Sequence, residues 1–113
     1  MILKLDEIEL CHLPEFKGGM KELAANMFFD GTNRIFRGCL VPGASIGIHT
    51  HDDSCEVIFV LSGHGLLHEP ETGHKDVYSG DCLYCPKGYS HSLLNPETSD
   101  EDLVFLAVVA AQA

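Results

Sequence analysis

Short apolar runs separated by turn residues recur along the chain of 113 residues. Asp-Gly, Pro-Gly, Ser-Gly and Asn-Pro pairs lie between the runs, and they favour tight turns because glycine accepts positive φ and proline fixes φ. Strands of this length and spacing are typical of an all-β sandwich or barrel. The pattern predicts seven strands, over residues 34–41, 45–50, 56–61, 65–69, 81–85, 92–94 and 103–109.

The N-terminal segment has a weaker pattern. Residues 1–30 are interpreted as an N-terminal arm or edge-strand segment, with one short edge strand predicted at residues 2–5. Residues 20–28 fit a short amphipathic helix or a strand equally well. No linker-like stretch divides the sequence, so residues 1–113 are expected to form a single domain.

Two of the predicted strands are apolar at every position rather than at alternate positions. Residues 57–61 read Val-Ile-Phe-Val-Leu, and residues 103–109 read Leu-Val-Phe-Leu-Ala-Val-Val. Side chains alternate between the two faces of a strand, so both faces of these strands must be covered. This requirement favours a homodimer in which a partner covers the outer face. The alternative is that the N-terminal arm alone covers it.

The net charge of the chain disfavours some classes of binding partner. Seven Lys and Arg residues against seventeen Asp and Glu residues give a net charge of −10, which disfavours nucleic acid and anionic membrane surfaces. No segment approaches the roughly 20 apolar residues of a membrane span, and acidic residues follow the start too soon for a signal peptide. We therefore expect a cytoplasmic location. The five irregularly spaced cysteines are expected to be reduced thiols rather than disulfides.

Candidate metal ligands cluster in the stretch HTHDDSCE, residues 49–56. His49 and His51 are two positions apart in a predicted strand, so both side chains can approach one ion from the same face. Glu56 follows His49 by seven positions, an odd offset that would put it on the opposite face of an uninterrupted strand. The turn-forming residues 52–54 are expected to interrupt the strand and to restore Glu56 to the side of the histidines.

His91 is the best candidate for a fourth ligand, because it follows the sharp turn Pro86-Lys87-Gly88 at the start of another predicted strand. The same face of that strand would carry Leu93 and Asn95. The other histidines lie in the arm, in a polar loop or near a strand start, and we interpret them as ordinary surface or edge residues: His12, His64, His68 and His74.

These residues fall into two motifs that resemble the signatures of the cupin family. The first motif is Gly, five residues, His-x-His, four residues, Glu, six residues, Gly, and it runs from Gly43 to Gly63. The second is Gly, five residues, Pro-x-Gly, two residues, His, three residues, Asn, and it runs from Gly80 to Asn95. Every specified position matches. The two motifs span residues 43–95, just under half of the chain.

The resemblance implies a double-stranded β-helix, a jelly-roll-like barrel, that holds an ion inside through four ligands: His49, His51, Glu56 and His91. Three neutral imidazoles and one carboxylate suit one divalent transition metal ion, and Fe, Mn, Ni, Co, Cu and Zn are all chemically admissible. Such a site has a net charge of +1. It would attract a carboxylate, an enolate or a deprotonated hydroxyl despite the acidic exterior.

The residues beside the expected ion predict an apolar wall for a substrate pocket. Ile58 and Val60 share the strand face of Glu56, and Leu93 shares that of His91. Cys82 and Cys85 form a CxxC motif, but in an extended strand their side chains face opposite ways, which argues against a disulfide or a zinc site. One of the two thiols is left to line the cavity. The predicted pocket residues are Ile58, Val60, Cys85 and Leu93.

Four charged residues have two interpretations each. Arg34 and Arg37 differ in strand parity, so only one can point inward to meet a carboxylate; alternatively, both are solvated surface residues. Asp52 and Asp53 are interpreted first as turn residues and second as a proton acceptor at the mouth of the pocket.

The sequence therefore predicts a metal-binding small cupin that acts on a small organic acid, a polyol or a similar metabolite. The expected chemistry is metal-dependent isomerisation or proton transfer, or Fe-dependent dioxygenation. No catalytic residue is assigned. The alternative is a non-catalytic module or sensor that binds a small ligand and uses the metal structurally.

Overall fold

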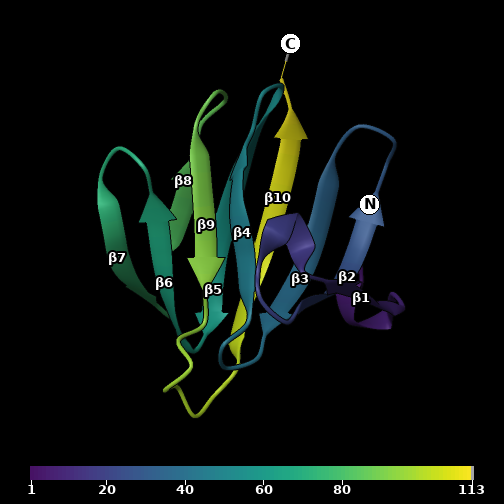
Figure 1. Ribbon diagram of the computed structural model, residues 1–113. Helices are drawn as coiled ribbons and strands as arrows, with labels where there is room; N and C mark the ends of the chain where they lie inside the picture. The colour runs from purple at the N-terminus through teal and green to yellow at the C-terminus, as the bar shows by residue number, and fades with distance from the viewer. Residues whose placement is uncertain (113) are drawn as a thin grey trace.

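The computed structural model describes residues 1–112, which form two antiparallel β-sheets that face each other (Figure 1). One sheet has six strands in the order β1-β2-β3-β10-β5-β8, and the other has four in the order β4-β9-β6-β7. In chain order the elements are η1 (Leu5–Glu7), β1 (Leu10–Pro14), η2 (Phe16–Gly18), β2 (Glu22–Phe29), β3 (Arg34–Leu40), β4 (Ser45–Thr50), β5 (Ser54–Ser62), β6 (His64–Glu69), β7 (Gly73–Tyr78), β8 (Cys82–Cys85), β9 (Ser90–Leu94) and β10 (Leu103–Ala111), where η marks a short 3-10 helix.

The prediction of an all-β double-stranded β-helix is confirmed, and each of the seven predicted strands is present with shifts at its ends. The sequence pattern missed β7. This strand reads Gly-His-Lys-Asp-Val-Tyr, and only Val77 in it is buried. An edge strand with one buried side chain has too little alternation to be distinguished from a polar loop.

The N-terminal segment differs most from expectation. The edge strand predicted at residues 2–5 is wrong: the chain forms η1 there, and the edge strand is β1. The ambiguous residues 20–28 belong largely to β2, which lies between β1 and β3. Leu23 and Ala25 are fully buried at alternate positions of β2, so the period of two indicates a strand.

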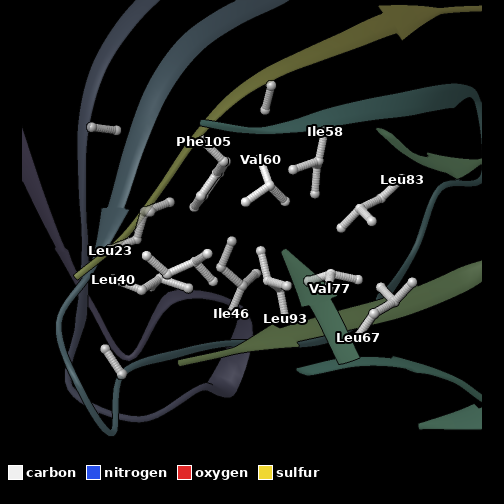
Figure 2. Packing of buried hydrophobic residues seen from close by; sticks show 14 of the residues in the cluster. Leu23, Leu40, Ile46, Ile58, Val60, Leu67, Val77, Leu83, Leu93 and Phe105 are labelled. Carbon is white, nitrogen blue, oxygen red and sulfur yellow. The ribbon is translucent and has the colours of Figure 1, made fainter. Parts of the chain in front are cut away.

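The core fills the space between the two sheets. Figure 2 shows Phe105, Val60 and Ile58 pointing from the six-stranded sheet toward Ile46 and Leu93 of the four-stranded sheet. Phe105 is fully buried and lies directly opposite Gly38 on the neighbouring strand. A Cβ on Gly38 would be 2.4 Å from the Phe105 ring. Gly38 therefore leaves the space that the aromatic ring occupies.

Two further observations concern the whole described chain. Each of the five cysteines is a free thiol. Neither of the short helices within residues 1–112 has the length and apolar character needed to cross a membrane.

The contact between Gly38 and Phe105 can be tested by substitution. We expect Gly38→Ala to lower the free energy of unfolding by about 1–3 kcal/mol, because the new methyl group overlaps a ring that cannot move into solvent. Phe105→Leu alone should also destabilise the chain. The double variant should lose less than the sum of the two single losses, since leucine vacates part of the space that the new methyl group needs. Urea unfolding midpoints, compared at equal slope, measure these terms. Strict additivity would contradict the contact.

Candidate metal centre

Four side chains converge inside one end of the barrel. His49 lies on β4, His51 follows the end of that strand, Glu56 lies on β5 and His91 lies on β9. One ligand atom from each of the four lies within 4.8 Å of the others. Three of the four are buried, and His49 is partly exposed. The residues that the sequence singled out as metal ligands are thus brought together.

The imidazole Nε2 atoms surround one carboxylate oxygen. Glu56 Oε1 is 2.8 Å from His91 Nε2, 3.1 Å from His51 Nε2 and 3.8 Å from His49 Nε2. The Nε2 atoms of His51 and His91 are 3.1 Å apart. Two ligand atoms at about 2.1 Å from one ion and at right angles to each other are separated by about 3 Å. The spacing of the donor atoms therefore fits a transition metal ion.

Two of the rings are oriented by partners on their other nitrogen. His49 Nδ1 lies 2.8 Å from the Gly47 carbonyl oxygen, and a carbonyl only accepts hydrogen bonds, so Nδ1 carries the proton. The Nε2 lone pair of His49 is then free to bind a metal ion. His51 Nδ1 lies 3.0 Å from Ser54 Oγ. These contacts turn the Nε2 atoms toward Glu56.

Glu56 carries its charge inside the barrel with 5% of its surface exposed. Burial is the largest influence on the pKa of Glu56 and raises it, because the charged form loses water. The interactions with His49, His51 and His91 act in the opposite direction and together prevail, so the pKa lies well below its ordinary value. The carboxylate is therefore an anionic donor at neutral pH.

The connections between strands explain how the motif spacing produces this geometry. The chain leaves the four-stranded sheet after β4 and enters the six-stranded sheet at β5. Glu56 therefore faces the histidines from across the barrel. The strand is interrupted close to the predicted residues 52–54: β4 ends at Thr50 and β5 begins at Ser54, so the break covers residues 51–53 and Ser54 already belongs to the next strand. The cause is a change of sheet rather than a bulge within one strand.

The second motif holds the first in place. His49 and His91 are paired neighbours on β4 and β9. The backbone N–H of His51 donates to the Tyr89 carbonyl, and the N–H of Gly88 donates to the His51 carbonyl. Gly88 has φ of +87°, a conformation that favours glycine. The β4–β5 and β8–β9 connections therefore run side by side at the upper end of the barrel (Figure 1).

A cleft of about 480 Å³ opens over three of the four residues, and His91 instead lines a small cavity beside it. His49, His51 and Glu56 form its floor. Its walls come mainly from the first third of the chain and from the β4–β5 connection, through Phe16, Lys17, Met27, Phe29, Arg34, Phe36, Asp52 and Asp53. Except for Arg34, Asp52 and Asp53, the sequence analysis missed these wall residues, because they lie outside the two motifs. Alternation within β2 and β3, which puts Met27, Phe29 and Phe36 on the inner face, was the available signal.

The two early arginines have different positions. Arg34 lines the cleft, and its guanidinium lies 4.1 Å from the centre of the Phe29 ring. An Arg34 nitrogen is also 3.7 Å from the Met27 sulfur. Arg37 is exposed and is paired with Leu106 of β10. The prediction that only one of the two can point inward agrees with this arrangement, and the inward one is Arg34.

The residues predicted to form the substrate pocket separate into two pairs. Ile58 and Leu93 line a small cavity beside His49, Glu56 and His91. Val60 and Cys85 are buried in the core and line neither this cavity nor the cleft. Both point inward, as parity predicts, but at their positions the barrel interior is filled by other side chains.

Cys85 lies close to the cluster without joining it. It pairs with Glu56 across β8 and β5. Burial, followed by the negative charge of Glu56, raises the pKa of Cys85 to about 11. Cys82 is exposed, so the two thiols of the CxxC motif face opposite ways as expected. A neutral, buried thiol is a weak metal ligand and a weak nucleophile.

The remaining four histidines lie outside the cluster. His64 Nε2 is 2.7 Å from Asp76 Oδ1, and His68 contacts His74 across β6 and β7. His12 pairs with Glu22 at the edge of the other sheet. Within residues 1–112, the one group of three or more His, Cys, Asp or Glu side chains close enough together to hold a metal ion is the cluster at Glu56.

Comparison with known proteins agrees with this site. An oxalate-binding protein of Thermotoga maritima is 33% identical over 117 residues, covering 96% of this chain and 93% of its own. A crystal structure of a predicted oxalate decarboxylase from Thermotoga maritima has a TM-score of 0.87 and 29% identity, covering 98% and 99% of the two chains. A double-stranded β-helix protein from Klebsiella pneumoniae, at 21% identity, has a TM-score of 0.72 over 97% and 84% of the chains and shows the fold alone.

The family comparison covers the barrel and all four converging residues. Residues 36–109 match the model of the cupin domain, and the match includes both motifs on which the sequence resemblance rested. The matched residues include most of β3 to β10 and the centre at Glu56, whereas β1 and β2 lie outside the match. The chain therefore belongs to the cupin domain family.

Proposed function

We propose that this protein binds one divalent transition metal ion through His49, His51, Glu56 and His91, and binds a small organic acid on that ion. The observation that carries the proposal is the convergence of three Nε2 atoms on one buried carboxylate oxygen at 2.8, 3.1 and 3.8 Å. An ion placed between these atoms would engage the Nε2 lone pair of His49 and offset the buried charge of Glu56. With the ion bound, the centre supplies a Lewis acid of net charge +1.

The cleft adds a second reason to expect an anionic ligand. Arg34 stands at its wall, stacked on Phe29, and Lys17 also lines it. Asp52 and Asp53 line the same cleft, so the attraction for a carboxylate would come from the bound ion together with Arg34 and not from the net charge of the lining. The relative from Thermotoga maritima is named an oxalate-binding protein. Oxalate, with one carboxylate for the ion and one for Arg34, is therefore the ligand that we propose first.

Binding is better supported than turnover. Glu56 is held by three histidines, so it is not free to accept a proton from a ligand. Asp52 and Asp53 line the cleft but are exposed, and neither belongs to the group of converging ligand atoms. Isomerisation, proton transfer and Fe-dependent dioxygenation are further hypotheses for the same site. Isomerisation and proton transfer require a ligand that can rearrange, and dioxygenation requires a ligand that can take up oxygen.

The metal proposal predicts the effect of removing one ligand. Protein purified without chelators or a histidine tag should contain about one ion per chain, and His51→Ala should contain less than about a tenth of that amount, because a three-ligand site binds far more weakly. Elemental analysis measures the content and identifies the metal. His74→Ala, at an exposed histidine outside the cluster, is the matched control and should retain the ion. Equal metal content in wild type and His51→Ala would contradict the site.

The ligand proposal predicts a metal-dependent stabilisation. Oxalate at about 100 times its dissociation constant should stabilise the metal-loaded protein by about 2.7 kcal/mol, and it should not stabilise the chelator-stripped protein. Arg34→Gln should weaken oxalate binding about 10-fold without loss of metal, because one charge-assisted contact disappears. Thermal melting and calorimetric titration measure these effects.

Arg37→Gln is the matched control for this measurement. Arg37 is exposed like Arg34 and lies on the same strand, but it pairs with Leu106 and does not line the cleft, so this variant should bind oxalate as the wild type does. Equal affinity in Arg34→Gln and wild type would remove Arg34 from the proposal. Stabilisation of stripped and loaded protein to the same extent would place the ligand elsewhere.

Turnover can be tested separately from binding. We expect the Fe(II)-loaded protein to consume no oxygen with oxalate, and the Mn, Ni or Zn forms to leave the ligand unchanged without oxygen, because Glu56 is held by three histidines and the carboxylates of Asp52 and Asp53 are exposed. An oxygen electrode and mass spectrometry of the ligand give the two readings. Oxygen uptake that His51→Ala lacks would establish dioxygenation, and anaerobic conversion of a ligand would establish isomerisation.

A further inference from the structure

One row of paired residues crosses the inner face of the six-stranded sheet along the cleft. Glu56 on β5 pairs with Val109 on β10, and Val109 pairs with Arg34 on β3. Arg34 pairs in turn with Phe29 on β2. Paired side chains of an antiparallel sheet point to the same face, so all four share the face on which Glu56 meets the histidines. Each of the four lines the cleft.

This register separates Arg34 from the metal centre. Neighbouring strands lie about 4.8 Å apart, so the backbone of Arg34, two strands from that of Glu56, is about 10 Å away from it. The guanidinium lies 4.1 Å from the centre of the Phe29 ring, and Phe29 is one strand further from Glu56. The cation is thus held on the side of the cleft away from the centre.

The charge of Arg34 is not compensated by a carboxylate of the described chain. Within residues 1–112, none of the ion pairs includes Arg34. Asp52 and Asp53 also line the cleft, but they belong to the connection between β4 and β5 and not to the row that carries Arg34. An anionic group of a ligand can therefore pair with this guanidinium.

The surface between the centre and Arg34 is apolar. Val109 occupies the intervening position of the row. Phe36 and Met27 pair with each other one step further along β3 and β2, and Ala111 lies on the other side of the row. All four line the cleft. Its volume of about 480 Å³ is within the roughly 300–1,000 Å³ of pockets for drug-sized ligands, so oxalate fills only part of it.

We propose that the cleft binds dicarboxylic acids longer than oxalate, with one carboxylate at the metal centre, the other at Arg34 and the carbon chain over Val109. This inference rests on the proposed function, because the first carboxylate needs the ion. A metal–oxygen bond of about 2 Å and an N–O contact of about 3 Å leave about 5 Å of the spacing of about 10 Å between the two backbones. A short chain of methylene groups spans that remainder. Oxalate reaches Arg34 only when the guanidinium leaves the Phe29 ring.

The test compares a dicarboxylate with the monocarboxylate of equal length on the metal-loaded protein. Glutarate should bind at least about 10-fold more tightly than pentanoate, because only glutarate presents a second charge to Arg34. Arg34→Gln should remove this difference. Arg37→Gln, at an arginine of the same strand that does not line the cleft, is the matched control and should preserve it. Calorimetric titration gives the dissociation constants, and the metal content of each variant is measured alongside.

Phe29→Leu tests where the cation is held. Phe29 is 50% exposed, so its replacement leaves the core intact. Without the ring, glutarate binding should weaken about 3-fold, because the guanidinium is no longer kept at the far side of the cleft. Oxalate binding should stay the same or tighten. Equal weakening of both acids would contradict the assigned position of Arg34.

The outcomes separate this inference from the proposed function. If oxalate binds the metal-loaded protein but glutarate has no advantage over pentanoate, the inference is overturned and the proposed function stands. A glutarate advantage that survives Arg34→Gln, or that persists in chelator-stripped protein, would also overturn the inference. If neither oxalate nor glutarate binds the loaded protein, both proposals fail.

Discussion

The structure depends on the presence of a carboxylate inside a closed apolar barrel. Glu56 lies on a strand whose inward neighbours, Ile58 and Val60, are core residues. A buried charge is unfavourable unless other groups replace the water it loses. Here three imidazoles from β4, from the residue that follows it and from β9 face the carboxylate, and a cation held between them and Glu56 would complete the compensation. Both sheets must therefore be assembled before the charge is compensated, which links the fold to the centre.

The two motifs made the centre predictable from sequence, because they specify residues whose positions are fixed by turns. Gly88 and the pairing of His49 with His91 hold the two connections together, and both follow from motif spacing. The argument from alternating strand faces correctly predicted that Glu56 faces the histidines, but it assumed a turn or bulge within one strand, whereas the chain changes sheet. Local alternation reports the faces of one strand, whereas the change of sheet between β4 and β5 is a property of the topology.

The features that the sequence did not predict depend on residues that are far apart in the chain and meet only in the folded barrel. The wall of the cleft is built by Phe16, Met27 and Arg34, which approach the centre only because β2 and β3 join the six-stranded sheet. Likewise, Val60 and Cys85 have the parity expected of pocket residues but lie where the core is filled. Parity gives the direction of a side chain and not its depth along the barrel.

This division between barrel and wall bears on what membership in the family establishes. The match to the cupin domain covers residues 36–109 and so includes every residue that meets Glu56. It excludes Lys17, Phe29 and Arg34, which face the same cleft. A change among these wall residues would alter the charge and shape of the cleft and leave the four converging side chains in place. The family match therefore bears on the centre, while the cleft in which we propose that a ligand binds is walled largely by residues outside that match. Under the proposed function, Arg34, stacked on Phe29 at this wall, favours a small acid with two anionic groups.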